Sequence, residues 1–93
     1  MELGPHNIRV NGVVPGNVNG DRMDRVVAAH AETDKLAVEQ VRHMYAVGTS
    51  MQCFVDPEEI ADLIVFLCSD YGRHISGQIV AVDGNTETLY PRL

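Results

Sequence analysis

The sequence predicts an α/β fold in which two parallel strands are joined by a long helical connection. Apolar runs rich in β-branched residues occupy residues 8–14 and 78–83, and a turn signal follows each run. Between them, apolar residues recur with the spacing of helices. A strand, a helical connection and a second strand in this order are typical of a parallel pair with a right-handed crossover. We therefore expect one domain with two strands and about three helices.

The first strand is expected over residues 8–14. Its nearly continuous apolar far end is typical of a strand that is covered on both faces. Arg9 and Asn11 interrupt the pattern, and we interpret them as polar groups that hydrogen-bond to neighbouring loops. Before the strand, residues 1–7 look like the last turn of a helix followed by a loop, with Gly4 as the residue that closes the helix.

A Pro-Gly turn ends this strand. Pro15 has no backbone N–H and cannot continue a central ladder, whereas Gly16 lets the chain turn and lets another group approach the backbone closely. The dipeptide alone is typical of an ordinary turn. In open α/β sheets, however, ligands bind just past the carboxyl ends of the strands. The turn is therefore a candidate for contact between a ligand and the main chain.

Two helices are expected in the connection, over residues 21–31 and 35–46. Asp21 is a candidate N-cap for the first, and the pair Thr33-Asp34 is a candidate cap for the second. Gly48 is placed to end the second helix. The pattern alone favours a packed helical hairpin, and a mobile lid is the alternative.

The clearest local signal predicts a third helix over residues 56–70. Asp56 is a candidate N-cap, Pro57 occupies the first helical position, and Glu59 completes an Asp-x-x-Glu capping pattern. The apolar stripe is wide enough to indicate burial against more than one neighbour. Its members are Ile60, Leu63, Ile64, Val65, Phe66, Leu67 and Cys68. We expect Cys68, within this stripe, to be a small buried hydrophobe.

Composition excludes several classes of protein. The net charge is −6 and the seven lysines and arginines are scattered, which disfavours nucleic-acid binding. No apolar run approaches the roughly 18 residues that span a bilayer, and the N-terminus lacks the pattern of a signal peptide. Two cysteines, Cys53 and Cys68, do not make a disulfide framework, so we expect a reducing, cytoplasmic location.

The usual motifs of metal, hydrolase and phosphate sites are absent from the sequence. The four histidines, at positions 6, 30, 43 and 74, do not have the spacing of a metal motif, so we expect no metal site. No serine lies in a Gly-x-Ser-x-Gly elbow. There is neither a Gly-x-x-x-x-Gly-Lys-[Ser/Thr] loop nor a Gly-x-Gly-x-x-Gly turn after a strand.

Three stretches together resemble one known family. Residues 8–16 read Ile-Arg-Val-Asn-Gly-Val-Val-Pro-Gly, which resembles the sixth-strand motif of the short-chain dehydrogenases/reductases. Residues 56–61 and 66–70 are similar to the last large helix of that family, and residues 75–78 and 82–84 to its final strand and the approach to it. The resemblance covers nearly the whole chain, in order.

This resemblance implies that residues 1–93 form the C-terminal part of a Rossmann-like, doubly wound parallel sheet. The implied activity is hydride transfer between NAD or NADP and a small alcohol or carbonyl substrate. The implied cofactor-binding residues are Pro15, Gly16, Asn17 and Val18. Residues 20–48 correspond to the segment that covers the substrate. In the family, the final helix and strand commonly form part of a homotetramer interface.

The chain also departs from the family pattern. The glycine-rich phosphate loop and the catalytic serine are missing, and none of Tyr45, Tyr71 and Tyr90 is followed by lysine four residues later. Gly20 stands where the family often has threonine, and Asn85 where it commonly has glycine. We expect no catalytic residue among the 93. We also expect the isolated chain to be inactive, to fold poorly or oligomerise, and to bind dinucleotide weakly.

Two alternatives to a dehydrogenase portion stay open. In the first, the chain is a non-catalytic remnant that acts as an oligomerisation or binding module. In the second, it is a self-standing small α/β domain. An open reading frame upstream that encodes Tyr-x-x-x-Lys and a glycine-rich loop would favour the dehydrogenase.

Overall fold

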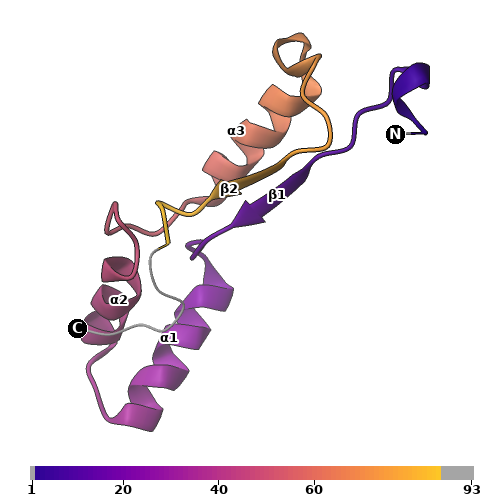
Figure 1. Cartoon of the computed structure of the whole chain (residues 1–93). Helices are drawn as coiled ribbons and strands as arrows, with labels where there is room; N and C mark the ends of the chain where they lie inside the picture. Colours follow the sequence, from indigo (N-terminus) through magenta and orange to yellow (C-terminus); the bar gives the residue numbers. More distant parts are fainter. Residues whose placement is uncertain (1, 87–93) are drawn as a thin grey trace.

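A two-stranded parallel sheet pairs a strand near the start of the chain with a strand near the end of the described residues. In the computed structural model, which describes residues 2–86, the order is η1, β1, α1, α2, α3, η2 and β2 (Figure 1). The bounds are η1 Gly4–His6, β1 Gly12–Pro15, α1 Asp21–Asp34, α2 Val38–Val47, α3 Pro57–Cys68, η2 Asp70–Gly72 and β2 Ile79–Val82. The predicted α/β class, the parallel pair and the three α-helices are confirmed.

The strand pair is short, and β1 begins later than predicted. Its register runs from Gly12 opposite Ile79 to Pro15 opposite Val82. Residues 8–11 lie outside the ladder. Val10 O still accepts from Gly77 N–H at 2.7 Å, but side chains make the other bonds there: the Asn11 Nδ2 donates to Ile75 O at 3.0 Å, for example. The expectation of a strand from residue 8 is therefore wrong.

Pro15 is the last residue of β1, and the register explains how proline fits there. The N–H groups of Gly12 and Gly16 donate across the sheet, the latter to Val82 O at 2.9 Å. Alternate residues donate in a parallel ladder, so the nitrogen of Pro15 faces away from β2 and no bond to β2 is lost.

Arg9 ties the approach to β1 to the end of α3. Its Nη1 donates to the carbonyls of Leu67 and Gly72, the second at 2.5 Å. The last carbonyls of a helix lack intrahelical partners, and a cation near them is favourable. The interpretation of Arg9 and Asn11 as hydrogen-bonding partners of neighbouring segments is confirmed.

The helices α1 and α2 form a packed pair with its own small core. Val27, Ala31 and Val41 are buried between them, and Met23, Leu36 and Tyr45 pack against this cluster. His30 adds a polar link across the pair, because its Nδ1 lies 3.1 Å from the Tyr45 hydroxyl. A packed helical pair, rather than two separate helices, therefore occupies the middle of the chain.

The ends of α1 differ from the predicted ones. Asp21 is the first helical residue and Gly20 the N-cap, with no capping side chain. The helix also runs through Thr33 and Asp34, which were expected to cap the next helix, and ends at Lys35 in the left-handed conformation. Local capping signals were overridden here by the apolar contacts that continue to Ala31 and Leu36.

The start of α3 agrees with the capping pattern in the sequence. Glu59 Oε2 accepts a hydrogen bond from Asp56 N–H at 2.7 Å, as in a capping box, and Pro57 is the first helical residue. Leu67 is buried, but Cys68 is exposed, so the expectation of a buried thiol is wrong. Only one side of α3 faces β1 in the described part of the chain, and Val65, on another side, is 67% exposed.

The N-terminal segment is a single 3-10 turn, so the expected α-helical turn closed by Gly4 is also wrong. Gly4 begins η1, and Asn7 at φ 61° closes it, with its N–H bonded to Gly4 O. Asparagine tolerates this left-handed conformation better than most residues, which explains the position of the turn.

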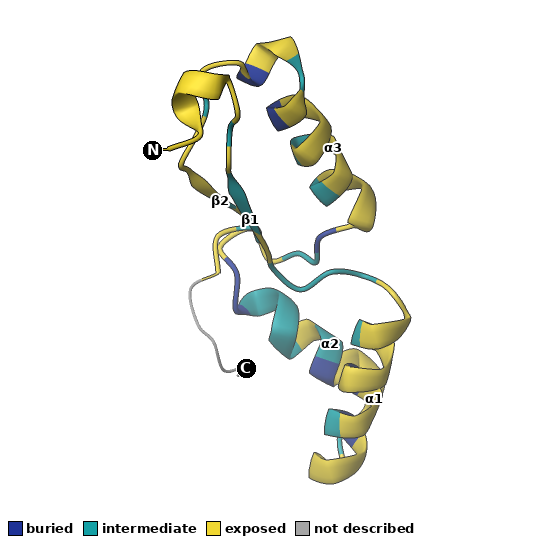
Figure 2. Ribbon diagram, turned by 90° about the vertical axis from the view of Figure 1, so that its right-hand side faces the viewer, coloured by how far each residue is buried: buried dark blue, intermediate teal, exposed yellow. Residues whose placement is uncertain are grey.

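Most of the described residues are exposed or only partly buried (Figure 2), and many of the exposed ones are large and apolar. The chain extends over 56 × 23 × 21 Å and its radius of gyration is 16.8 Å, against about 12 Å for a compact domain of this length. Exposed large hydrophobics include Ile8, Val10, Val14, Ile64, Val65, Phe66 and Ile79. They lie on both strands, on the segment that leads into β1 and on α3, as expected for a sheet that has further elements to pack against. None of the helices within residues 2–86 has the length and hydropathy to cross a bilayer.

Two adjacent valines of α1 provide a matched test of the helical pair. Val27 is fully buried and Val26 is 40% exposed. We expect Val27→Ala to lower the free energy of unfolding by about 2 kcal/mol, whereas Val26→Ala lowers it by less than about 0.5 kcal/mol. Both changes alter helix propensity equally, so the difference measures packing. Urea unfolding followed by the helical circular dichroism signal checks this, and equal effects would contradict the packing of α1 against α2.

Candidate functional site

The candidate site is the turn that follows β1, at the carboxyl end of the sheet. Gly16 lies directly against the end of β2: a Cβ on Gly16 would come within 2.6 Å of both Cα and Cβ of Asp83. No side chain fits at that distance without movement of the backbone. Gly16 is thus required by the close approach of the two chain segments that leave the sheet.

A second parallel pairing continues beyond the turn. Val55 N–H donates to Asn17 O at 2.8 Å, and Asn19 N–H donates to Val55 O at 2.7 Å. Val55 therefore bonds to Asn17 and Asn19, the residues on either side of Val18. Because alternate residues pair in a parallel ladder, the N–H and C=O of Val18 itself point away from Val55. Neither group of Val18 has a partner among residues 2–86. The turn therefore presents one main-chain donor and one main-chain acceptor side by side.

A cavity of about 500 Å³ lies between this turn and the first turns of α1. Pro15, Gly16 and Val18 line it on one side. From the helix side its lining includes Arg22, Met23 and Val26. Asn17 is not part of the lining, since its carbonyl is bonded to Val55. Three of the four residues singled out from the sequence thus meet in one cavity, and the fourth supports its wall.

The turn is held at both of its flanks. Asn19 Nδ2 donates to Asp56 Oδ1 at 2.8 Å, which joins the turn to the start of α3. Gly20, the N-cap of α1, has φ 153° and ψ −179°, a conformation that a threonine side chain would strain. The glycine that replaces the family's threonine thus agrees with the local backbone.

A neighbouring loop after β2 supports the same region. Gly84 O accepts from Met51 N–H at 3.0 Å and Asn85 O accepts from Ser50 N–H at 2.7 Å. Gly84 and Asn85 have φ values of 66° and 65°. Asparagine is among the residues best suited to this left-handed region, so Asn85 can replace the usual glycine without losing the turn.

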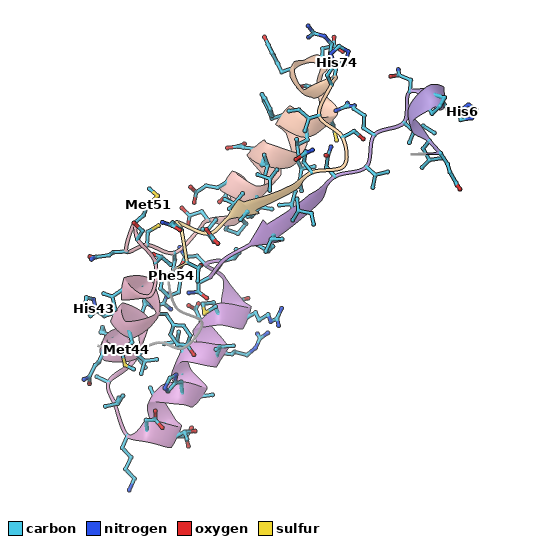
Figure 3. All side chains as sticks on the ribbon, viewed as in Figure 1. His6, His43, Met44, Met51, Phe54 and His74 are labelled. Atoms are coloured by element: carbon cyan, nitrogen blue, oxygen red, sulfur yellow. The ribbon has the colours of Figure 1, made fainter. Side chains whose placement is uncertain are left out.

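The turn itself offers main-chain hydrogen bonding and apolar contact, and the charged residues of the cavity lining, Asp21 and Arg22, come from α1. No group of three or more His, Cys, Asp or Glu that could hold a metal ion occurs within the described part of the chain. His6, His43 and His74 lie in different regions of the molecule (Figure 3). His30 bonds to Tyr45 and, through Nε2, to Asp34 Oδ2 at 2.9 Å. A main-chain donor and acceptor side by side can hold and orient a ligand that carries a matching acceptor and donor.

Two supporting residues were missed by reasoning from the sequence. Val55 pairs with the turn and Asp83 fixes the position of Gly16, yet each is distant from residues 15–18 along the chain. Val55 lies just before the capping pattern of α3, which was interpreted only as a helix start. The pairing of distant segments has no local signal in a single sequence.

Comparison with known families identifies this arrangement. The family model described as enoyl-(acyl carrier protein) reductase matches residues 1–85. Among curated relatives, 3-oxoacyl-[acyl-carrier-protein] reductase FabG of Aquifex aeolicus is 34% identical over 85 residues, covering 89% of this chain and 29% of the relative. The 7alpha-hydroxysteroid dehydrogenase of Escherichia coli is also 34% identical, over 84 residues, covering 90% of this chain and 29% of the relative. The chain thus spans about a third of the length of such relatives.

Solved structures with the same fold point to the same family. A short-chain dehydrogenase family protein from Francisella tularensis superposes with a TM-score of 0.84 at 28% identity, covering 89% of this chain and 34% of that structure. L-sorbose reductase from Gluconobacter frateurii, complexed with NADPH and L-sorbose, gives 0.81 at 28% identity, covering 95% of this chain and 34% of that structure. The chain belongs to the short-chain dehydrogenase/reductase family.

Proposed function

We propose that this chain forms the nicotinamide-binding and substrate-covering part of an NAD(P)-dependent oxidoreductase that acts on an alcohol or carbonyl compound. The observation that carries the proposal is the pair of main-chain groups on Val18 that have no partner among residues 2–86, beside a cavity that Pro15 and Gly16 also line. Family membership and relatives described as NADPH-dependent or bound to NADPH support it.

The residues of the turn fit a nicotinamide. Its carboxamide carries both a donor and an acceptor, which complement the C=O and the N–H of Val18. Pro15 presents an apolar ring surface for the flat heterocycle, and Gly16 keeps the turn free of a side chain. Bound there, the nicotinamide would supply or accept the hydride. The role of residues 15–18 is to hold and orient it.

The helices α1 and α2 are placed to cover the substrate. Met23 and Val26 give the cavity an apolar wall opposite the turn, and α2 packs behind α1 through Val41. An apolar wall excludes water from the reacting carbon and strengthens electrostatic interactions within the site. This assignment corresponds to the segment over residues 20–48, and it makes Met23 and Val26 candidates for substrate selection.

Proton transfer and phosphate binding need residues that this sequence does not contain, namely the catalytic serine, the Tyr-x-x-x-Lys pair and a glycine-rich loop. We infer that the 93-residue chain alone is inactive and acts as part of a larger catalytic unit. The open apolar surface of β1 and α3 supports this inference. Both cysteines are free, which fits a reducing compartment such as the cytoplasm.

The catalytic unit is proposed to be a homo-oligomer, with a tetramer as the form expected from the family. Support comes from β2 and α3, where Ile79 is 78% exposed and Val65 is 67% exposed. Near the end of α3, the side chains of Phe66 and Tyr71 stack nearly parallel, at 6.4 Å between ring centroids. A module that only oligomerises is the second candidate, favoured by this same surface but not by the groups on Val18.

A chimera tests the proposed function directly. This chain is joined to the part of the Aquifex aeolicus reductase that precedes the matched segment, and NADPH oxidation is followed with a 3-oxoacyl thioester. We expect turnover, because the chain supplies the missing turn and helices. A chimera with cooperative thermal unfolding that binds no NADPH would contradict the proposal and favour the oligomerisation module.

Two glycines of the β1 region provide a matched pair within that chimera. Gly16→Ala places a Cβ 2.6 Å from Asp83, whereas Gly12→Ala places one 3.6 Å from Ile79 Cγ1, an ordinary contact. We expect Gly16→Ala to raise KM for NADPH about tenfold or more and Gly12→Ala to change it by less than about twofold. Equal effects of the two substitutions on KM for NADPH would contradict a special role of the turn in cofactor binding.

The isolated chain is expected to bind dinucleotide weakly, because most of the cofactor's phosphate contacts come from elsewhere in the family fold. Fluorescence titration of the 93-residue chain with NADH and NADPH should therefore give no saturation in the micromolar range. Micromolar binding by the chain alone would show that it holds a complete dinucleotide site.

A further inference from the structure

Arg42 lies where three parts of the molecule meet. It belongs to α2, and its Nη2 donates to Asp24 Oδ1 on α1 at 2.5 Å. The same guanidinium lies over the ring of Phe54, with Cζ 5.2 Å from the ring centroid. Arginine suits such a position because its planar group can stack on a ring and donate in its own plane at the same time.

Phe54 connects this contact to the candidate site. It directly precedes Val55, whose backbone bonds to Asn17 O and Asn19 N–H on either side of Val18. A displacement of Phe54 is thus passed to Val55 through one peptide unit. The side-chain path from α1 to the Val18 main chain runs through Arg42 and Phe54. The end of α2 has a second link to the same loop, because the Thr49 hydroxyl donates to Ala46 O and accepts from Cys53 N–H.

We propose that Arg42 is a positioning residue that fixes α1 and α2 relative to the main chain of Val18. This inference rests on the proposed function in so far as Val18 faces the cofactor and α1 covers the substrate. The contact of His30 with Tyr45 holds α1 against α2 but does not include the loop that carries Phe54. Without Arg42 the helical pair stays intact, but the side-chain link between α1 and the loop that carries Phe54 is lost.

Stability alone would not reveal this role. The side chains of Arg42 and Asp24 are 36% and 60% exposed, and ion pairs this exposed contribute little to folding free energy. A purely structural surface pair would therefore leave the site unchanged when removed. A positioning residue would alter the Val55 pairing and substrate binding while the strand ladder stays as it was.

Amide hydrogen exchange on the folded chimera provides the first measurement. Arg42→Met should speed exchange of the Val55 and Asn19 amides about threefold, the size expected when an exposed cation–π contact is lost. The Gly16 amide, bonded to Val82 in the ladder, should not change and reports on global stability. Arg25→Met, which removes an exposed arginine of α1 and the same charge, is the matched control.

Substitutions of the ring extend the test. Phe54→Tyr keeps the aromatic face and should leave the Val55 and Asn19 amides as in the wild type, whereas Phe54→Leu should reproduce Arg42→Met. The proposal is overturned if the Val55 and Asn19 amides exchange at the same rate in Arg42→Met as in Arg25→Met. It is also overturned if the wild-type Val55 amide shows no protection.

Kinetics of the chimera provide the second measurement. Arg42→Met should raise KM for the carbonyl substrate about threefold and change KM for NADPH by less than about twofold, because Val18 keeps its own groups. Arg25→Met should change neither constant. A chimera without activity would argue against the proposed function, while the exchange data would still decide whether Arg42 positions the Val55 pairing. Equal rises of both KM values would contradict the assigned role.

Discussion

The pairing of β1 with β2 is the constraint on which the rest of the structure depends. The two strands lie more than sixty residues apart in the chain, and their register sets Pro15 opposite Val82. That register brings Gly16 against Asp83 so closely that no Cβ fits between them. The same pairing places Arg9 at the carbonyl end of α3. One short ladder thus decides where the first turn lies, how α3 is held and which groups the turn presents.

Two consequences for the site follow from this ladder. The chain leaves β1 in an extended path, so Asn17 and Asn19 can pair with Val55 while Val18 turns its N–H and C=O outward. The helical pair then starts immediately at Gly20, which puts Met23 and Val26 opposite the turn. Main-chain groups and an apolar wall suit a ligand that must be held flat and kept from water. Binding by the main chain also tolerates much sequence change, which agrees with relatives only about a third identical.

The sequence predicted the elements well where local rules decide them. The capping pattern at Asp56 and Glu59 located the start of α3, and the Pro-Gly turn located the end of β1. The prediction failed where contacts between residues distant in the sequence decide the structure. The side chain of Asn11 replaces ladder bonds and shortens β1, and Cys68 is exposed because the described chain covers only one side of α3. The turn was predicted to contact a ligand through Pro15, Gly16, Asn17 and Val18, and three of these line the cavity. The support from Val55 and Asp83 was not predicted, since such pairings leave no periodic signal in one sequence.

The central claim is that the main chain after β1 holds a nicotinamide ring. A crystal structure of the chimera with bound NADPH tests it most directly. The account predicts the carboxamide within about 3 Å of both the N–H and the C=O of Val18, with the ring against Pro15. A nicotinamide bound away from residues 15–18, with the groups of Val18 bonded to protein instead, would contradict the account.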